Sequence, residues 1–162
     1  MQLSQAGVAF IQGQESCVLT PYADPGGLGT SIGYGHFYSN TTPASQIPQT
    51  ITKAQATSFF NSDVASFVTT VNQSLSVSVS QSAFDALVDY TYTRGGPNYL
   101  SSGIPQAINS GDLQAAANII RTTGLGCGTK AQAALQNRRN LEAQMLLGQS
   151  TLSGNSYLFP ST

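Results

Sequence analysis

The stretch ESCVLTPYADPGGLGTSIGYGH, residues 15–36, decides how the rest of this 162-residue chain is interpreted. It opens with Glu15, carries Asp24 in its middle and closes with the chain's single histidine, His36. Five glycines between them indicate sharp turns and close approach of the backbone, and short β-like pieces alternate with these turns. On residue types alone, a surface β-hairpin with ordinary acids explains the stretch slightly better than a catalytic site.

The composition limits the class of protein. A chain of 162 residues is long enough for one domain with a real core, and its ordinary apolar content excludes general disorder. Only 8% of the residues are charged, so there is no basic patch of the kind that nucleic-acid binding requires. No apolar run is long enough to predict a membrane span, and the N-terminus does not follow the pattern of a signal peptide.

Order and spacing change the interpretation of residues 15–36. Glu15, Tyr22, Asp24, a Gly-rich turn and then SIGYGH resemble the catalytic segment of the phage-type lysozymes, glycoside hydrolase family 24. In that family a glutamate ends the first helix, an aspartate follows at the same spacing, and a threonine precedes an Ile-Gly-x-Gly-His turn. The resemblance continues through ITKAQA at 51–56, FDALV at 84–88 and LQNRRNLE at 135–142, and covers roughly residues 5–147.

The chain departs from the family pattern at two places. The hydroxyl before the Ile-Gly turn belongs to Ser31, with Thr30 beside it, where the family has a threonine. Thr93 stands where the family often has Asn or Gln. The first departure leaves open whether Ser31 or Thr30 takes the role of the family's hydroxyl.

The resemblance implies an α+β, lysozyme-like fold in a single domain, residues 1–162. It has a small Gly-rich β-lobe (about 18–50), a long connecting helix (about 52–73) and a larger helical lobe (1–16 and 80–162). Helical periodicity and capping residues predict further helices at 5–15, 81–93, 104–109, 113–121 and from 129 onward. The predicted caps are Ser4, Thr52 with Gln55, Ser80 and Asp112. The tail after Gly148 is interpreted as a loosely docked end.

Three residues are the candidates for catalysis. Cleavage of a glycosidic bond needs a protonated acid at the leaving oxygen, and we assign Glu15 to that role. By resemblance, Asp24 positions a water together with Ser31. The simpler alternatives are a solvated glutamate at a helix end and an aspartate that caps the turn before Pro25.

The resemblance also assigns supporting residues. Arg138, with Arg139 as the alternative, holds Glu15, and His36 pairs with Asp63. Aromatic faces suit sugar rings, and amides offer both a donor and an acceptor. The family's sugar contacts, carried across by position, fall on Phe37, Tyr92, Asn118 and either Ser102 or Gly103.

The two cysteines, Cys17 and Cys127, allow one disulfide, and two buried free thiols explain them equally well. They lack the spacing of a metal site, and with a single histidine in the chain we expect no metal and no cofactor.

The predicted function is that of a muramidase, an inverting hydrolase of the β-1,4 bond between N-acetylmuramic acid and N-acetylglucosamine. The alternatives are a lytic transglycosylase, which dispenses with a second carboxylate, and an inactive wall-binding module on the same fold. The expected partner is the peptidoglycan glycan strand, with the protein a monomer that acts on the cell wall. Without a visible signal peptide, a holin-type or dedicated secretion route would release it.

Overall fold

The computed structural model describes residues 1–24, 26–125, 130–149, 151–153 and 156–158. The chain forms two compact units. One, here called the sheet unit, comprises residues 11–66; the other, the helical unit, comprises residues 1–10 and 67–162. Both boundaries fall inside helices, in α1 (Gln5–Gln14) and in α2 (Lys53–Ser74).

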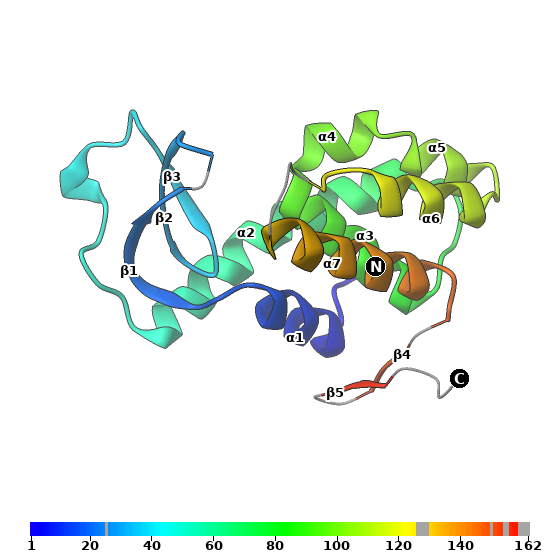
Figure 1. Ribbon diagram of the computed structural model, residues 1–162, viewed down its shortest axis with the longest axis horizontal. Helices are drawn as coiled ribbons and strands as arrows, with labels where there is room; N and C mark the ends of the chain where they lie inside the picture. Colours follow the sequence, from blue (N-terminus) through cyan, green and yellow to red (C-terminus); the bar gives the residue numbers. More distant parts are fainter. Residues whose placement is uncertain (25, 126–129, 150, 154–155, 159–162) are drawn as a thin grey trace. The chain divides into compact units, whose positions relative to one another are not determined.

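A three-stranded antiparallel sheet in the order β1-β2-β3 is the frame of the sheet unit (Figure 1). Its strands are β1 (Val18–Ala23), β2 (Gly29–Gly33) and β3 (His36–Ser39). A short 3₁₀ turn, Ala44–Gln46, follows in the loop that leads to α2. The small sheet and the helical part confirm the predicted α+β fold.

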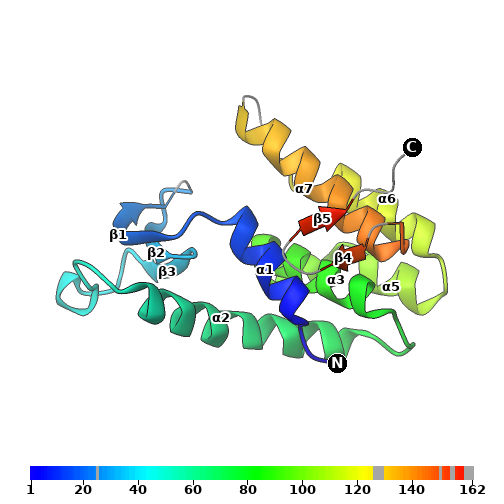
Figure 2. The same ribbon diagram turned by 90° about the horizontal axis from the view of Figure 1, so that it is seen from below.

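The start of α2 is fixed by the capping box that the sequence predicts. The Thr52 N–H donates to Gln55 Oε1 at 2.8 Å, and the Gln55 N–H donates to Thr52 Oγ1 at 3.1 Å. This reciprocal pair satisfies two donors that a helix start leaves unpaired. The long helix that follows (Figure 2) places Phe59 against His36 of the sheet, with the rings stacked at 4.4 Å.

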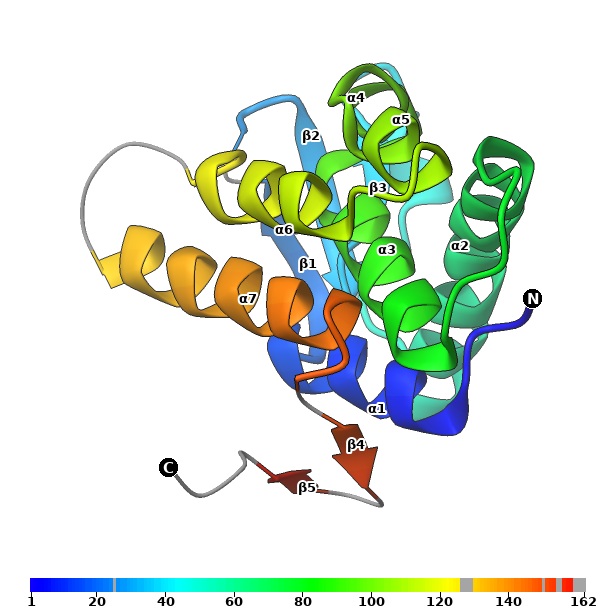
Figure 3. The same ribbon diagram turned by 90° about the vertical axis from the view of Figure 1, so that its right-hand side faces the viewer.

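The helical unit is built around α3 (Gln81–Arg94), which is buried along most of its length. Figure 3 shows α5 (Ile104–Asn109), α6 (Leu113–Thr122) and α7 (Lys130–Leu146) around it. Apolar residues such as Phe84, Leu87 and Ile120 are fully buried in this core. Burial of such side chains contributes about 1.5–3 kcal/mol each and holds the helices together.

The predicted caps are formed. Ser4 Oγ accepts from the Gly7 N–H at 3.0 Å, Ser80 from Ala83 at 3.1 Å and Asp112 Oδ1 from Ala115 at 2.8 Å. These bonds act within one turn, which explains why the helix starts were predictable from sequence.

The sequence interpretation missed one α-helix and two β-strands. Helix α4 (Gly96–Ser101) begins in a Gly-Gly-Pro string that reads as a loop, because Pro97 at the first turn fits a helix start as well as a turn. After Gly148, where the sequence interpretation named only a loosely docked end, two short strands, β4 (Thr151–Ser153) and β5 (Ser156–Leu158), pair antiparallel.

Four charged side chains are buried between α3 and α7. Arg138 donates from Nε and Nη2 to the two carboxylate oxygens of Asp89, at 3.0 and 2.5 Å. Arg139 donates to Glu142 Oε2 at 2.7 Å and to Thr93, and its guanidinium lies 4.8 Å from the centre of the Tyr90 ring. Asp89, Arg139 and Glu142 are fully buried. Buried charges are stable in a folded protein only when they are paired.

The buried Glu142 predicts a pH dependence of stability. Burial raises the pKa of Glu142 well above its usual range, the Asp89 carboxylate raises it further, and Arg139 opposes both. A carboxyl whose folded pKa exceeds its unfolded value of about 4.3 stabilises the fold fully below that value. Its contribution is lost as pH rises through the folded pKa.

We therefore expect the unfolding free energy of the wild type to fall more steeply above about pH 4.3 than that of Glu142→Gln. Denaturant titrations of both proteins at several pH values measure the difference. Parallel curves for the two proteins across this range would contradict a raised Glu142 pKa.

Candidate active site

Glu15 follows directly on the last residue of α1. Its N–H donates to Ile11 O at 3.0 Å, so the backbone continues the helical hydrogen-bonding pattern for one residue beyond Gln14. The residue is half-buried, and its backbone is fixed at the C-terminal end of a helix. The family resemblance predicts the catalytic acid at the end of the first helix, which is where Glu15 lies.

Asp24 lies in the turn between β1 and β2. Its Oδ2 accepts from the Gly26 N–H at 2.9 Å, and its carbonyl accepts from Gly27 at 2.8 Å. A Cβ at position 26 would lie 2.8 Å from Asp24 Oδ2, so any other residue there would displace the end of the Asp24 side chain. The turn-capping role considered from the sequence is therefore real, and it holds the carboxylate in place.

The strand register separates the two candidate hydroxyls. Ser31 lies opposite Tyr22 on β1 and Phe37 on β3, whereas Thr30 lies opposite Ala23 and Tyr38. Successive side chains of a strand point to opposite faces, so Ser31 and Thr30 face opposite sides of the sheet. Ser31 is 4% exposed.

The charges of the two candidate carboxylates also act on Tyr22. Burial raises the pKa of Tyr22, the neighbouring Ser31 side chain opposes the rise, and the Glu15 and Asp24 carboxylates add to it. Tyr22 therefore lies on the face of the sheet that carries Ser31 and feels the charge of both carboxylates. From the sequence, Tyr22 was only one residue of the family motif. Its place opposite Ser31 could be seen only from the strand register. The geometry favours Ser31 over Thr30 as the hydroxyl of the site.

Phe37 lies on the same face as Ser31 and is 46% exposed. A Cβ at Gly29 would come within 2.8 Å of the Phe37 ring, so the ring lies against a residue without a side chain. An exposed ring beside the candidate hydroxyl can stack on a sugar.

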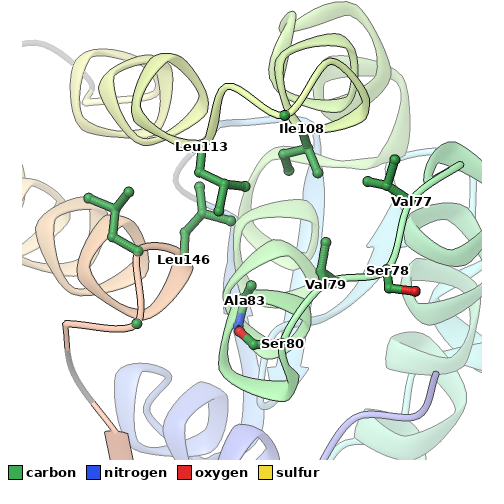
Figure 4. Close-up of a pocket in the computed structure, with 11 residues that line it drawn as sticks. Val77, Ser78, Val79, Ser80, Ala83, Ile108, Leu113 and Leu146 are labelled. Atoms are coloured by element: carbon green, nitrogen blue, oxygen red, sulfur yellow. The ribbon is translucent and has the colours of Figure 1, made fainter.

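Two cavities lie elsewhere. One, of about 390 Å³, includes Thr30 and Ile47 in its lining, with no acid among the lining residues. The other, of about 460 Å³, belongs to the helical unit, where Ile108, Leu113 and Leu146 surround it (Figure 4). None of its lining residues is charged, so it has no group for acid–base chemistry.

His36 and Asp63 form the pair that the resemblance implies. His36 Nδ1 lies 2.8 Å from Asp63 Oδ2 and 3.0 Å from Oδ1, and both residues belong to the sheet unit. The His36 ring also meets Tyr38 edge-on at 4.9 Å. With a carboxylate on one nitrogen and rings on two sides, His36 ties β3 to α2.

The remaining assigned residues lie in the helical unit. Tyr92 is half-buried, with its ring edge-on to Phe67 at 5.6 Å. Asn118 is exposed, and its Oδ1 accepts from Gln114 at 3.1 Å. Ser102 Oγ donates to Tyr99 O at 2.6 Å and accepts from the Ile104 N–H at 3.1 Å. These bonds give Ser102 a local role at the start of α5, and its contact with sugar stays a prediction.

Arg138 has a partner that the sequence interpretation did not name, Asp89 of α3. An aspartate inside the apolar run of a core helix was the available signal, since a buried acid requires a cation. The contact of Arg138 with Glu15 would join the two units and stays a prediction.

Three further expectations concern a disulfide, a metal site and a membrane span. Cys17 is half-buried, but Cys127 lies outside the described residues, so the disulfide stays a prediction. Among the described residues, no cluster of three His, Cys, Asp or Glu side chains is arranged to hold a metal ion. Within that same part of the chain, no helix combines the length and apolarity needed to cross a membrane.

Comparison with known proteins identifies the family. The sequence pattern of the phage lysozymes matches residues 12–142, most of the chain. This chain belongs to the phage lysozyme family. The match contains Glu15, Asp24, Ser31 and Arg138, so every residue assigned to catalysis lies inside it.

Two solved structures and one relative extend the comparison. An endolysin from Escherichia coli O157:H7 phage FAHEc1 has a TM-score of 0.77 and 30% identity over 99% of this chain and 98% of its own. The muramidase domain of SpmX from Asticaccaulis excentricus has a TM-score of 0.76 and 25% identity over 90% and 97%.

The endolysin of Bacillus phage PZA is 40% identical over 88% of this chain. This chain spans only 54% of that relative's length. These likenesses establish a phage-lysozyme fold for this chain.

Proposed function

We propose that this chain is a muramidase that hydrolyses the β-1,4 bond between N-acetylmuramic acid and N-acetylglucosamine in bacterial peptidoglycan. The observation that carries the proposal is the order of the candidates in the sheet unit. Glu15 ends the helix before β1, Asp24 is held in the turn after β1 by the Gly26 N–H, and Ser31 lies opposite Tyr22 in the register of β1 and β2. Membership of the phage lysozyme family supports the same substrate.

In the proposed reaction, Glu15 donates its proton to the glycosidic oxygen as the bond from that oxygen to the anomeric carbon breaks. A water attacks the anomeric carbon from the other side of the sugar and gives its proton to Asp24. Ser31 shares the orientation of that water. A hydroxyl helps to place a water but adds nothing to a carboxylate nucleophile. The presence of Ser31 beside Asp24 therefore favours inversion over a covalent intermediate on Asp24.

Phe37 would offer its exposed ring to a sugar, with Tyr92 and Asn118 as further contacts from the helical unit. Arg138 would hold Glu15. We place the site of action at the cell wall, reached by a holin-type or dedicated secretion route.

Product analysis on a defined, soluble peptidoglycan fragment tests the reaction. We expect products that end in a reducing N-acetylmuramic acid, and the α-anomer as the first product seen by proton NMR before mutarotation. The α-anomer follows from inversion at a β-linked carbon.

Three other results would each overturn a different part of the proposed function. A product that ends in an anhydro sugar would identify a lytic transglycosylase. A β-anomer as first product, or a glycosyl adduct on Asp24, would replace inversion by retention. Binding to walls without any product would leave an inactive wall-binding module.

A further inference from the structure

We propose that Asp85 is a positioning residue for the proposed acid Glu15: it fixes the start of α1, and the helix carries that fixed position to Glu15 at its end. The inference rests on the proposed function, because Glu15 is the proton donor of the proposed hydrolysis. Asp85 itself is assigned no contact with substrate.

Asp85 is a buried carboxylate whose partners are all uncharged. It lies on α3 and is 2% exposed, and no Lys, Arg or His side chain of the described residues pairs with it. A buried carboxylate needs hydrogen-bond donors instead. Its Oδ1 accepts from the Ser4 N–H at 3.1 Å and from Gln81 Nε2 at 2.9 Å, and its Oδ2 accepts from the Ser4 hydroxyl.

The same bonds form the start of α1. Ser4 Oγ donates to Asp85 and accepts from the Gly7 N–H at 3.0 Å, so the cap of the helix is itself held by the carboxylate. Gln81 Nε2 also donates to Gln2 O at 2.9 Å, which holds the segment before the cap to α3. The partial positive charge at a helix N-terminus favours a carboxylate at this place. All of these residues belong to the helical unit.

Gly7 shows how closely α1 approaches Asp85. A Cβ at position 7 would lie 2.7 Å from Asp85 Cγ and 2.9 Å from its Oδ1. Glycine inside a helix is less favourable than alanine, so its presence here carries a cost in helix stability. In return, the backbone of α1 lies closer to the carboxylate than any other residue at position 7 would allow.

The helix links this contact to the proposed acid. α1 is continuous from Gln5 to Gln14, and the Glu15 N–H donates to Ile11 O, so one hydrogen-bonded backbone runs from the cap to Glu15. At 1.5 Å per residue, Ser4 and Glu15 are about 16 Å apart along the axis, and a tilt of about 4° at the start displaces the end by about 1 Å. A misplacement of about 1 Å can cost an enzyme about 100-fold in rate.

Amide hydrogen exchange, followed by NMR, tests the link without any enzyme activity. Asp85→Ala should speed exchange along α1 as far as the Glu15 N–H, because the whole helix loses its fixed start. Thr91→Val is the matched control: Thr91 is also buried on α3, but its hydroxyl donates to Leu87 O of the same helix at 2.7 Å. Exchange in α1 should be unchanged in this control. Faster exchange confined to the first turn of α1 in Asp85→Ala would overturn the proposal.

Steady-state kinetics test the positioning. Asp85→Ala should lower kcat by about 10- to 100-fold and leave KM within about twofold, because Glu15 acts in the chemical step. Asp85→Asn keeps Oδ1 as an acceptor for the Ser4 N–H and Gln81, so it should retain most of the wild-type kcat. An unchanged kcat in Asp85→Ala, or an equal loss in Asp85→Asn and Thr91→Val, would contradict the role.

A double-mutant cycle separates positioning from a general loss of fold. In the Glu15→Gln background, Asp85→Ala should change the residual hydrolysis by less than about twofold, because the group that it positions is gone. The same fold-loss in both backgrounds would overturn the proposal. If thermal unfolding shows that Asp85→Ala is not folded, Ser4→Ala, which removes only the hydroxyl bonds of the contact, carries the same cycle with a smaller loss.

The two proposals fail separately. Should the wild type hydrolyse no peptidoglycan, the proposed function fails, while hydrogen exchange still decides whether Asp85 fixes the helix end at Glu15. Should the wild type hydrolyse peptidoglycan and Asp85→Ala do so at the same rate, only the positioning role of Asp85 fails.

Discussion

Replacing Glu15 by glutamine is expected to reduce peptidoglycan hydrolysis by roughly 10²–10⁴-fold while the protein stays folded. The amide has nearly the same shape as the carboxyl group but has no acidic proton to give to the leaving oxygen. Because Glu15 is half-buried at the end of α1 and its backbone bond to Ile11 is unaffected, the substitution leaves the helix end intact. Release of reducing ends from purified walls measures the effect.

Asp112→Asn is the matched control for this change. Asp112 caps α6 through its Oδ1, and asparagine caps a helix equally well, so this carboxyl-to-amide exchange should leave both activity and stability unchanged. We expect Asp24→Asn to slow hydrolysis strongly and Ser31→Ala more mildly, because each leaves part of the water's environment in place. Hydrolysis at the wild-type rate in Glu15→Gln would remove the assignment of the acid.

The second large effect concerns stability. Asp89→Leu and Arg138→Met each remove one partner of a buried, two-point ion pair. Either change alone is expected to lower the unfolding free energy by about 3–5 kcal/mol, because a charge is left in the core without its partner. The double variant, which puts apolar side chains on both sides, should recover most of the loss, since apolar replacements of such pairs are often neutral. Urea unfolding of the wild type, the two single variants and the double variant gives the coupling free energy between Asp89 and Arg138.

Arg121→Met is the control for the arginine exchange itself. Arg121 is only partly buried, and its guanidinium has a weak 3.4 Å contact with Asn118, so its loss should cost at most about 1 kcal/mol. Additive losses in the Asp89→Leu/Arg138→Met double variant would show that the pair is not coupled.

The same double variant separates two roles of Arg138. If Arg138 also holds Glu15, as the family resemblance implies, the double variant regains stability but not hydrolysis. If it regains both, Arg138 serves the core alone.

Much of this protein follows from local sequence. Helix starts at Ser4, Thr52, Ser80 and Asp112 were predicted because a capping side chain bonds to a backbone N–H within the next turn. The sheet region was predicted because glycines and alternating short strands mark turns directly. Even Glu15 and Asp24 were found as a pair because their order and spacing along the chain carry the family pattern.

Other features depend on residues that are distant in sequence. Whether Ser31 or Thr30 faces the carboxylates is decided by the pairing of β1 with β2, in which a register irregularity lies between Val18 and Tyr22. A shift of one residue reverses the face of every following side chain, and no local pattern specifies where a bulge falls. Tyr22 became part of the site for the same reason.

The partner of Arg138 was decided by packing in the same way. Sequence placed an arginine on the last helix and an aspartate on the core helix, but only the contact of α3 with α7 brings their side chains to 2.5 Å. Sequence thus determined the types of elements and the chemistry available, since these depend on bonds within a few residues. Tertiary structure decided which hydroxyl and which carboxylate meet which partner, because those choices depend on register and helix packing across the chain.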